Sequence, residues 1–184
     1  MPFWICFVLF EVGWTIIVLG TQSYIYLTVI PLVITYLWFE NRAYQISSNQ
    51  QIARLLLTLF GFIFDSILEY FELISFRGNT EASLLLAPLW LFILWFWFSI
   101  TFSRCYSWLL NHAYFATLLG AIFGPISYWG ASKISIVTIV DPLLFTTLSI
   151  FFWSSLFALV FSFSSITKLF IYQLPNNDKE VQLL

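Results

Sequence analysis

Residues 52–73 of the chain read IARLLLTLFGFIFDSILEYFEL and place three acidic side chains in an otherwise apolar segment. Asp65, Glu69 and Glu72 follow the i, i+4, i+7 spacing, which puts them on one side of a helix. An ionised side chain at the bilayer centre costs about 2.5–3.5 kcal/mol on insertion scales, so such residues face a protein interior or a water-filled cavity. The segment therefore predicts a membrane-spanning helix that carries the first candidate for a functional site.

The composition of the whole chain also predicts a membrane protein. Of its 184 residues, 61% are hydrophobic and 9% are charged, and the mean hydropathy is +0.92. Soluble domains carry about 25% charged residues. We therefore expect an all-α fold, a polytopic transmembrane helical bundle. The net charge of −2 and the lack of a basic stripe argue against nucleic acid as a partner.

Six apolar runs give the expected spans, each near the length that a helix needs to cross about 30 Å of hydrocarbon. They cover about Pro2–Val18, Tyr24–Phe39, Ile52–Leu73, Leu84–Phe102, Ala113–Tyr128 and Leu143–Phe163. We expect residues 1–173 to form a single transmembrane domain and residues 174–184 a short cytoplasmic tail. The sequence shows no internal repeat.

Polar stretches separate the spans. Glu40–Gln51 and Arg77–Glu81 are expected to be loops, and Asp141-Pro142 is typical of an N-cap followed by the first residue of a helix. With six spans, Lys and Arg concentrate on the side that holds both chain ends, which predicts cytoplasmic termini. That side carries Arg42, Arg54, Arg104, Lys168 and Lys179, and the other carries Arg77 and Lys133.

The candidate catalytic residues are three carboxylates, Asp65, Glu11 and Glu69. Glu11 lies in the middle of the first span, at a depth similar to that expected for Asp65. Two carboxylates that meet in a low dielectric do not easily both ionise, so one of them would exchange a proton near neutral pH.

Arg54 and Gly61 are expected on the same helix face as Asp65. Together with Glu72 they extend the polar seam toward both ends of the third span. The alternative is structural, because Arg54 could extend its guanidinium to the membrane interface and Glu72 could lie outside the membrane.

Gly120 and Gly124 in the fifth span form a GxxxG spacing, which lets two helices approach closely. This spacing predicts a tight crossing within the molecule, with a dimer face as the alternative. Pro125 is expected to kink or unwind the helix and to free backbone carbonyls, which protein groups or a cavity must then satisfy. Ser127 and Tyr128 are the nearest candidates.

The candidate substrate-binding residues are Arg104, Thr101, Tyr128 and Trp14, which together with the carboxylates would line a lateral cavity. The guanidinium of Arg104 matches a lipid phosphate or a carboxylate, although the headgroup region alone would also hold it. No metal, cofactor or nucleotide motif occurs in the sequence. We therefore expect neither a metal nor a cofactor.

Three stretches and the fifth span together resemble a family of small bacterial inner-membrane proteins, domain of unknown function 2878. The stretches are Phe10-Glu11 with Trp14 and Gly20, Arg54-Leu-Leu with Gly61 and Asp65, and Pro88-Leu-Trp90-Leu with Leu94-Trp95, Thr101 and Trp108-Leu109; the most similar part is Gly120-Ala-Ile-Phe-Gly124-Pro-Ile-Ser-Tyr128. The resemblance covers roughly residues 5–140. It favours Asp65 over Glu11, since the family more usually has Gln at the position of Glu11.

The resemblance implies a multi-pass protein of the bacterial inner membrane. It also implies a setting in lipid metabolism, because members are often encoded near enzymes that modify membrane fatty acids. Three functions stay open: an enzyme or accessory factor acting on membrane lipids with Asp65 as general acid or base, a small proton-coupled transporter, and a structural subunit that docks a partner. The expected partners are membrane lipids, and a homodimer or a membrane-protein partner stays open.

Overall fold

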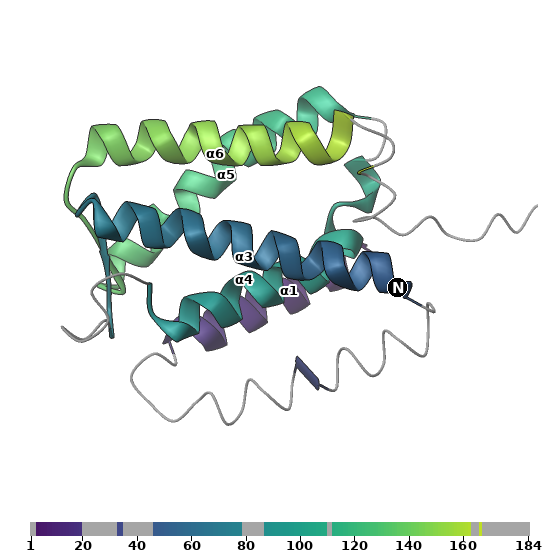
Figure 1. Cartoon of the computed structure of the whole chain (residues 1–184), viewed down its shortest axis with the longest axis horizontal. Coiled ribbons are helices and arrows are strands. Elements are labelled where there is room, and N and C mark those ends of the chain that lie inside the picture. Colours follow the sequence, from purple (N-terminus) through teal and green to yellow (C-terminus); the bar gives the residue numbers. More distant parts are fainter. Residues whose placement is uncertain are drawn as a thin grey trace, which may run out of the picture.

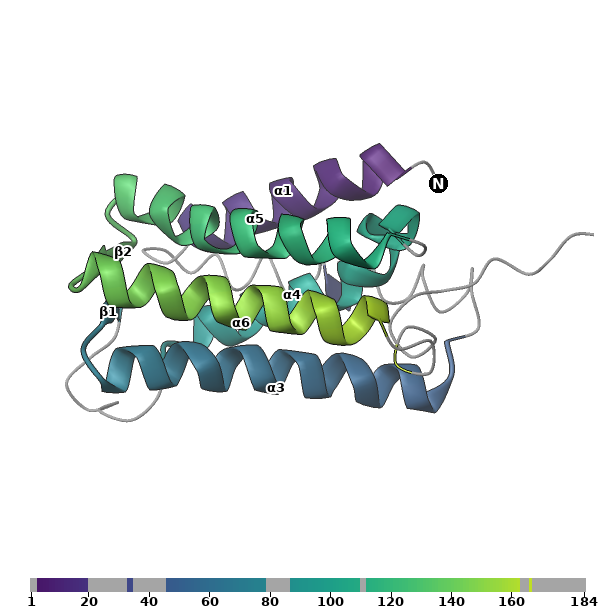
Figure 2. The same ribbon diagram turned by 90° about the horizontal axis from the view of Figure 1, so that it is seen from above.

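The computed structural model describes residues 3–19, 33–34, 46–78, 87–109, 112–162 and 166. These parts are mostly helical: α1 (Phe3–Leu19), α3 (Ser48–Tyr70), α4 (Leu89–Cys105), α5 (Ala113–Lys133) and α6 (Pro142–Ser162), with a short 3-10 helix at Ser107–Leu109 and two strands, β1 (Ile74–Phe76) and β2 (Val137–Ile139). The helices lie along the long axis of the molecule, and both strands lie at one end of the bundle (Figure 1, Figure 2). The helical prediction is confirmed, and two strands of three residues each add a short antiparallel pair to the helices.

Helix α4 holds one half of the bundle together, because α1 and α3 both pack on it. Trp97 of α4 donates its Nε1–H to the carbonyl of Phe10 in α1 at 3.2 Å. A Cβ on Gly13 of α1 would overlap the Trp97 ring, so the glycine permits this close approach. On the other side of α4, the buried hydroxyls of Thr58 and Ser99 lie 3.1 Å apart.

Helix α3 begins earlier than the polar composition suggests. Ser47 and Gln50 form a capping box, in which each side chain accepts a hydrogen bond from the backbone N–H of the other residue, at 3.3 and 3.1 Å. The prediction of a loop over Glu40–Gln51 is therefore wrong for Ser48–Gln51, because the cap carries the helix into this polar stretch.

Helices α3 and α5 end in the same way. Each ends in a Schellman motif whose left-handed position is held by a residue other than glycine, Glu72 (φ 55°) and Ser135 (φ 58°). The backbone hydrogen bonds of the two motifs are equivalent. After α3, the N–H groups of Leu73 and Glu72 donate to the carbonyls of Leu68 and Glu69. After α5, the N–H groups of Ile136 and Ser135 donate to the carbonyls of Ala131 and Ser132.

Each of these helix ends leads directly into a strand, and the two strands pair antiparallel. The central pair is Ser75 with Thr138, which are 63 residues apart, and the same shift carries all of β1 onto β2. The chain therefore contains two related units with the same element order, α3–β1–α4 and α5–β2–α6, and the antiparallel pairing of their equivalent strands relates them by an approximate two-fold axis. The sequence prediction of no internal repeat is wrong at the level of structure.

The other span boundaries agree with the helices in part. α5 continues through Pro125 to Lys133, so the unwinding expected at the proline does not occur. Asp141 accepts a hydrogen bond from the Leu144 N–H at 3.0 Å and Pro142 opens α6, which confirms the predicted cap. The predicted second span, Tyr24–Phe39, lies outside the described residues except for positions 33 and 34.

Among the helices that the structure describes, two, α3 and α6, are long and apolar enough to cross a membrane by length and composition. Their outward faces carry large exposed apolar side chains. On α3 these include Leu56 (59% exposed) and Phe60 (55%), and on α6 Leu143 (81%) and Phe151 (71%). A surface helix of a soluble protein has polar side chains on its outer face, whereas the outer faces of α3 and α6 are apolar.

Candidate functional site

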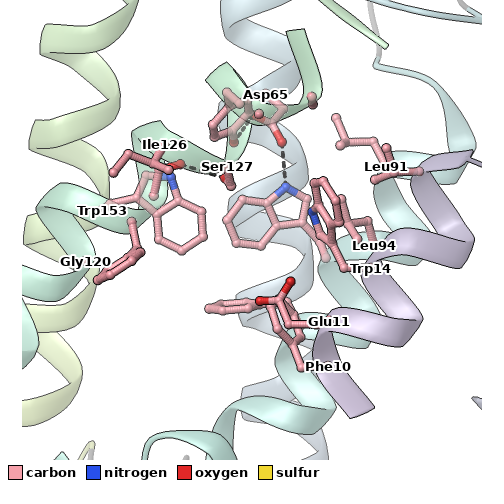
Figure 3. A pocket seen from close by; sticks show the side chains of 18 of the residues that line it. Phe10, Glu11, Trp14, Asp65, Leu91, Leu94, Gly120, Ile126, Ser127 and Trp153 are labelled. Carbon is pink, nitrogen blue, oxygen red and sulfur yellow. Dashed lines mark hydrogen bonds between the residues drawn. The ribbon is translucent and has the colours of Figure 1, made fainter. Parts of the chain in front are cut away.

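A cavity of about 560 Å³ lies between the α1–α4 pair and the α5–α6 pair. Helices α1, α4, α5 and α6 supply most of its walls, and Asp65 is the one lining residue that comes from α3. Half of the lining residues are aromatic, and most of the others are aliphatic or glycine. The cavity is therefore an apolar space with few polar groups, which is the usual character of a ligand site (Figure 3).

Asp65 is fully buried at the wall of this cavity. Its two carboxylate oxygens accept one short hydrogen bond each, from the Tyr128 hydroxyl to Oδ1 at 2.6 Å and from the Trp95 Nε1–H to Oδ2 at 2.6 Å (Figure 3). Both donors are neutral. Asp65 and Tyr128 are 63 residues apart, the shift that relates β1 to β2, so the two partners occupy equivalent positions in the two units.

Two glycines at this same spacing surround the pair. A Cβ on Gly61 would overlap the indole of Trp95, and a Cβ on Gly124 would overlap that of Trp153. The two indoles stack on each other with ring centroids 5.2 Å apart and planes 15° apart. The glycines thus make room for a tryptophan pair at the point where the two units meet.

The two tryptophans differ in their hydrogen bonds. Trp95 donates to Asp65, whereas the buried Nε1 of Trp153 lies close to the Tyr128 hydroxyl without hydrogen-bond geometry. The near-symmetric site is therefore chemically asymmetric, with a carboxylate acceptor on one side and a phenol donor on the other.

Glu11 lines the same cavity from α1 and directs its carboxylate into it, but it lies well apart from Asp65 (Figure 3). The sequence left open whether the two carboxylates meet; in the structure Asp65 forms its hydrogen bonds with Trp95 and Tyr128 instead. The cavity nonetheless brings both acids to one space. Trp14, one turn beyond Glu11 on α1, also lines this space.

Glu69, the third predicted carboxylate, has a different surrounding from Asp65 and Glu11. Its Oε1 accepts the backbone N–H of Phe76 at 3.1 Å, which ties the last turn of α3 to β1, and Glu69 does not line the cavity. The structure gives this residue a structural contact at the strand end of the bundle.

Three further predicted residues are placed as follows. Thr101 is buried in α4 with its hydroxyl against the carbonyls of Trp97 and Phe98, and it does not line the cavity. Arg104 lies in the last turn of α4, and its side chain is outside those that the structure describes. A Cβ on Gly120 would press on Phe157 of α6, so the GxxxG face of α5 forms a crossing within the molecule.

Arg54 and Glu72, at the two ends of the predicted polar seam, differ in their exposure. Arg54 is only 5% exposed, so it does not extend into the surroundings as the structural alternative supposed. Glu72 is exposed just beyond the end of α3.

Sequence reasoning missed Trp95 and Trp153 as members of the site. The signal was present, since both fall in the middle of an apolar helix rather than at its end. An indole N–H in that position needs an acceptor from another helix, because neither water nor the helix backbone supplies one. Within the described residues, no group of His, Cys, Asp and Glu has the arrangement of a metal site.

The fold and the site define a class of helical bundle in which two related helix–strand–helix units enclose a buried carboxylate–tyrosine pair. The chain belongs to the family described as "Protein of unknown function (DUF2878)", whose model matches residues 3–159. The family resemblance predicted from the sequence is thereby confirmed. No curated protein and no solved structure matches the chain.

Proposed function

We propose that this chain is a multi-pass protein of the bacterial inner membrane with six spans and cytoplasmic termini. The apolar outer faces of α3 and α6 support lipid contact. In addition, α1 and α3 run in the same direction, which is the arrangement that an intervening span between them would produce (Figure 2).

The proposed activity is binding of a lipid-like molecule in the cavity, with its apolar part against the aromatic walls and its polar end at Asp65. One observation carries this proposal: a fully buried carboxylate, held by Tyr128 and Trp95, opens onto an apolar cavity of about 560 Å³. A buried acid in a membrane protein is costly and is kept where it has a partner or a substrate.

In an enzyme or accessory factor of lipid modification, Asp65 would act on the polar end of the bound lipid. A carboxylate has about four lone-pair sites, and the hydrogen bonds from Tyr128 and Trp95 use two of them. The remaining sites leave Asp65 able to accept a hydrogen bond or a proton from a ligand, as a general base requires.

A small proton-coupled carrier is the second candidate, and the internal repeat is the observation that favours it. Parallel repeats related by an axis along the membrane normal are a common plan of transporters, with the substrate site at the repeat interface. The Asp65–Tyr128 pair lies at the interface between the two units.

The test compares the fatty-acid and phospholipid profiles of cells that lack the protein with those restored by the native chain, by Asp65→Asn or by the control Glu72→Gln. The control removes an exposed carboxylate outside the cavity. We expect a lipid species to change on deletion, and to be restored by the native chain and the control but not by Asp65→Asn. Unchanged profiles in all strains would refute the role in lipid modification.

For the carrier, the measurement is proton flux in proteoliposomes of the native chain and of Asp65→Asn. Flux that depends on Asp65, with an unchanged lipid profile, would support the carrier over the lipid factor. No flux in either sample would exclude the carrier.

A further inference from the structure

The charge of the cavity wall has one sign. Two of its lining residues are acidic, Asp65 and Glu11, and no Lys, Arg or His is among the described residues that line it. The two carboxylates reach the cavity from different helices, and Figure 3 shows both of them directed into the same space. An anionic ligand would meet repulsion there without a compensating base.

The uncharged part of the wall has the same preference. Five tryptophans and eight other aromatic side chains are among the described residues that line the cavity. The tryptophans are Trp14, Trp90, Trp95, Trp108 and Trp153. The face of an aromatic ring carries the negative end of its quadrupole and attracts cations, most strongly for tryptophan and when water is excluded. Aromatic faces that surround a carboxylate are the usual composition of sites for ammonium groups.

We propose that the cavity is selective for lipophilic cations, molecules that carry an amine, quaternary ammonium or similar positive group on an apolar body. The positive group would lie against Asp65 and the aromatic faces, and Glu11 would favour its entry from the α1 side. This inference rests on the proposed function, since it takes the cavity as the ligand site and adds the charge of the ligand.

The experiment uses two probes of nearly equal size and shape and opposite charge, tetraphenylphosphonium and tetraphenylborate. Binding to the purified full chain in a neutral detergent is measured by equilibrium dialysis, with protein-free micelles at the same concentration as the blank. We expect the cation to bind at least about tenfold more tightly than the anion, because carboxylates and aromatic faces both favour it.

Variants connect the selectivity to the cavity. Glu11→Gln changes an exposed side chain and is expected to fold normally, so it tests the idea even if Asp65→Asn does not fold. Either change should reduce the preference for the cation several-fold. Glu72→Gln removes an acid outside the cavity and should leave the preference unchanged.

The outcomes separate the two proposals. If both ions bind equally, or the anion binds more tightly, the cavity takes apolar ligands without charge selection, and only the present inference is overturned. If neither ion binds above the micelle blank, the cavity is not a site for lipophilic molecules, and the proposed function fails as well. A cation preference that survives both Glu11→Gln and Asp65→Asn would place binding elsewhere and overturn the inference.

Discussion

Replacing Tyr128 by Phe removes one hydroxyl and leaves Oδ1 of Asp65 without its donor. Asp65 is fully buried, and the lost hydrogen bond is 2.6 Å long. A buried acceptor that loses its partner costs about 1–3 kcal/mol, while hydrogen bonds between membrane helices average about 0.6 and reach about 1.7 kcal/mol. The short bond to a fully buried acceptor places this contribution at the upper end, so we expect Tyr128→Phe to destabilise the protein by about 1–2 kcal/mol.

The assay is thermal unfolding of the detergent-purified chain. In a protein of this size, 1 kcal/mol shifts Tm by about 2–4 °C, so the expected decrease is about 2–8 °C. Tyr114→Phe on the same helix is the matched control, because Tyr114 is 96% exposed. Its Tm should stay within about 1 °C of the native value, as is usual for surface substitutions.

A double-mutant cycle with Asp65→Ala decides whether the effect comes from the pair. Once the carboxylate is absent, the hydroxyl of Tyr128 has lost its acceptor, so Tyr128→Phe should cost much less in the Asp65→Ala background. We expect a coupling of about 1 kcal/mol, within the range seen for residues in direct contact. Strictly additive effects would refute the reasoning, since they would mean that the hydrogen bond does not connect the two units.

Three further changes test other parts of the fold by the same thermal assay. Gly124→Ala forces a Cβ into an indole of α6 and should lower the stability by about 1–3 kcal/mol. Gly130→Ala meets no atom within 4 Å, so it should leave the stability unchanged or raise it. Equal effects of the two changes would contradict the packing. Asp141→Ala removes the N-cap of α6 and should lower stability by about 1 kcal/mol, while Asp141→Asn should retain most of it. Glu72→Gly and Ser135→Gly relieve positive φ angles and should each raise Tm; a decrease would show that the side chains contribute more than the backbone strain costs.

Much of the architecture was predictable because it depends on local signals. The length of the apolar runs gave the helices, the Asp141-Pro142 pair gave the start of α6, and the glycine spacing of α5 gave its close crossing. The strands were not predictable from composition. Each strand has three residues, and the two strands pair only because the ends of α3 and α5, distant in sequence, lie side by side in the fold.

The candidate site was predictable only in part. Asp65 is identified by the cost of burying it, since an acid in an apolar span needs an explanation, and Tyr128 was named as a candidate from its place beside the glycines of the fifth span. The partner of Asp65 depends on the packing of α3 against the other unit, which no single segment encodes. The repeat escaped detection for a similar reason, because its equivalent positions hold different residues: an acid faces a phenol, and Glu72 corresponds to Ser135.

The approximate two-fold axis makes a final prediction about the asymmetry of the site. Trp95 donates to Asp65, and its counterpart Trp153 lies near Tyr128 with no acceptor for its N–H. The swapped double variant Asp65→Tyr/Tyr128→Asp would therefore find a donor already in place in the second unit.

Either single change of this swap should be the more damaging. Asp65→Tyr alone pairs two phenols and leaves Trp95 without its acceptor, and Tyr128→Asp alone brings two carboxylates together in a buried site. Thermal unfolding of the three variants should rank the double variant above both single ones. If the double variant is instead the least stable, the two units resemble each other in backbone only. The carboxylate acceptor would then be required on α3 because of the packing around that helix, and the pairing of donor and acceptor would not decide its position.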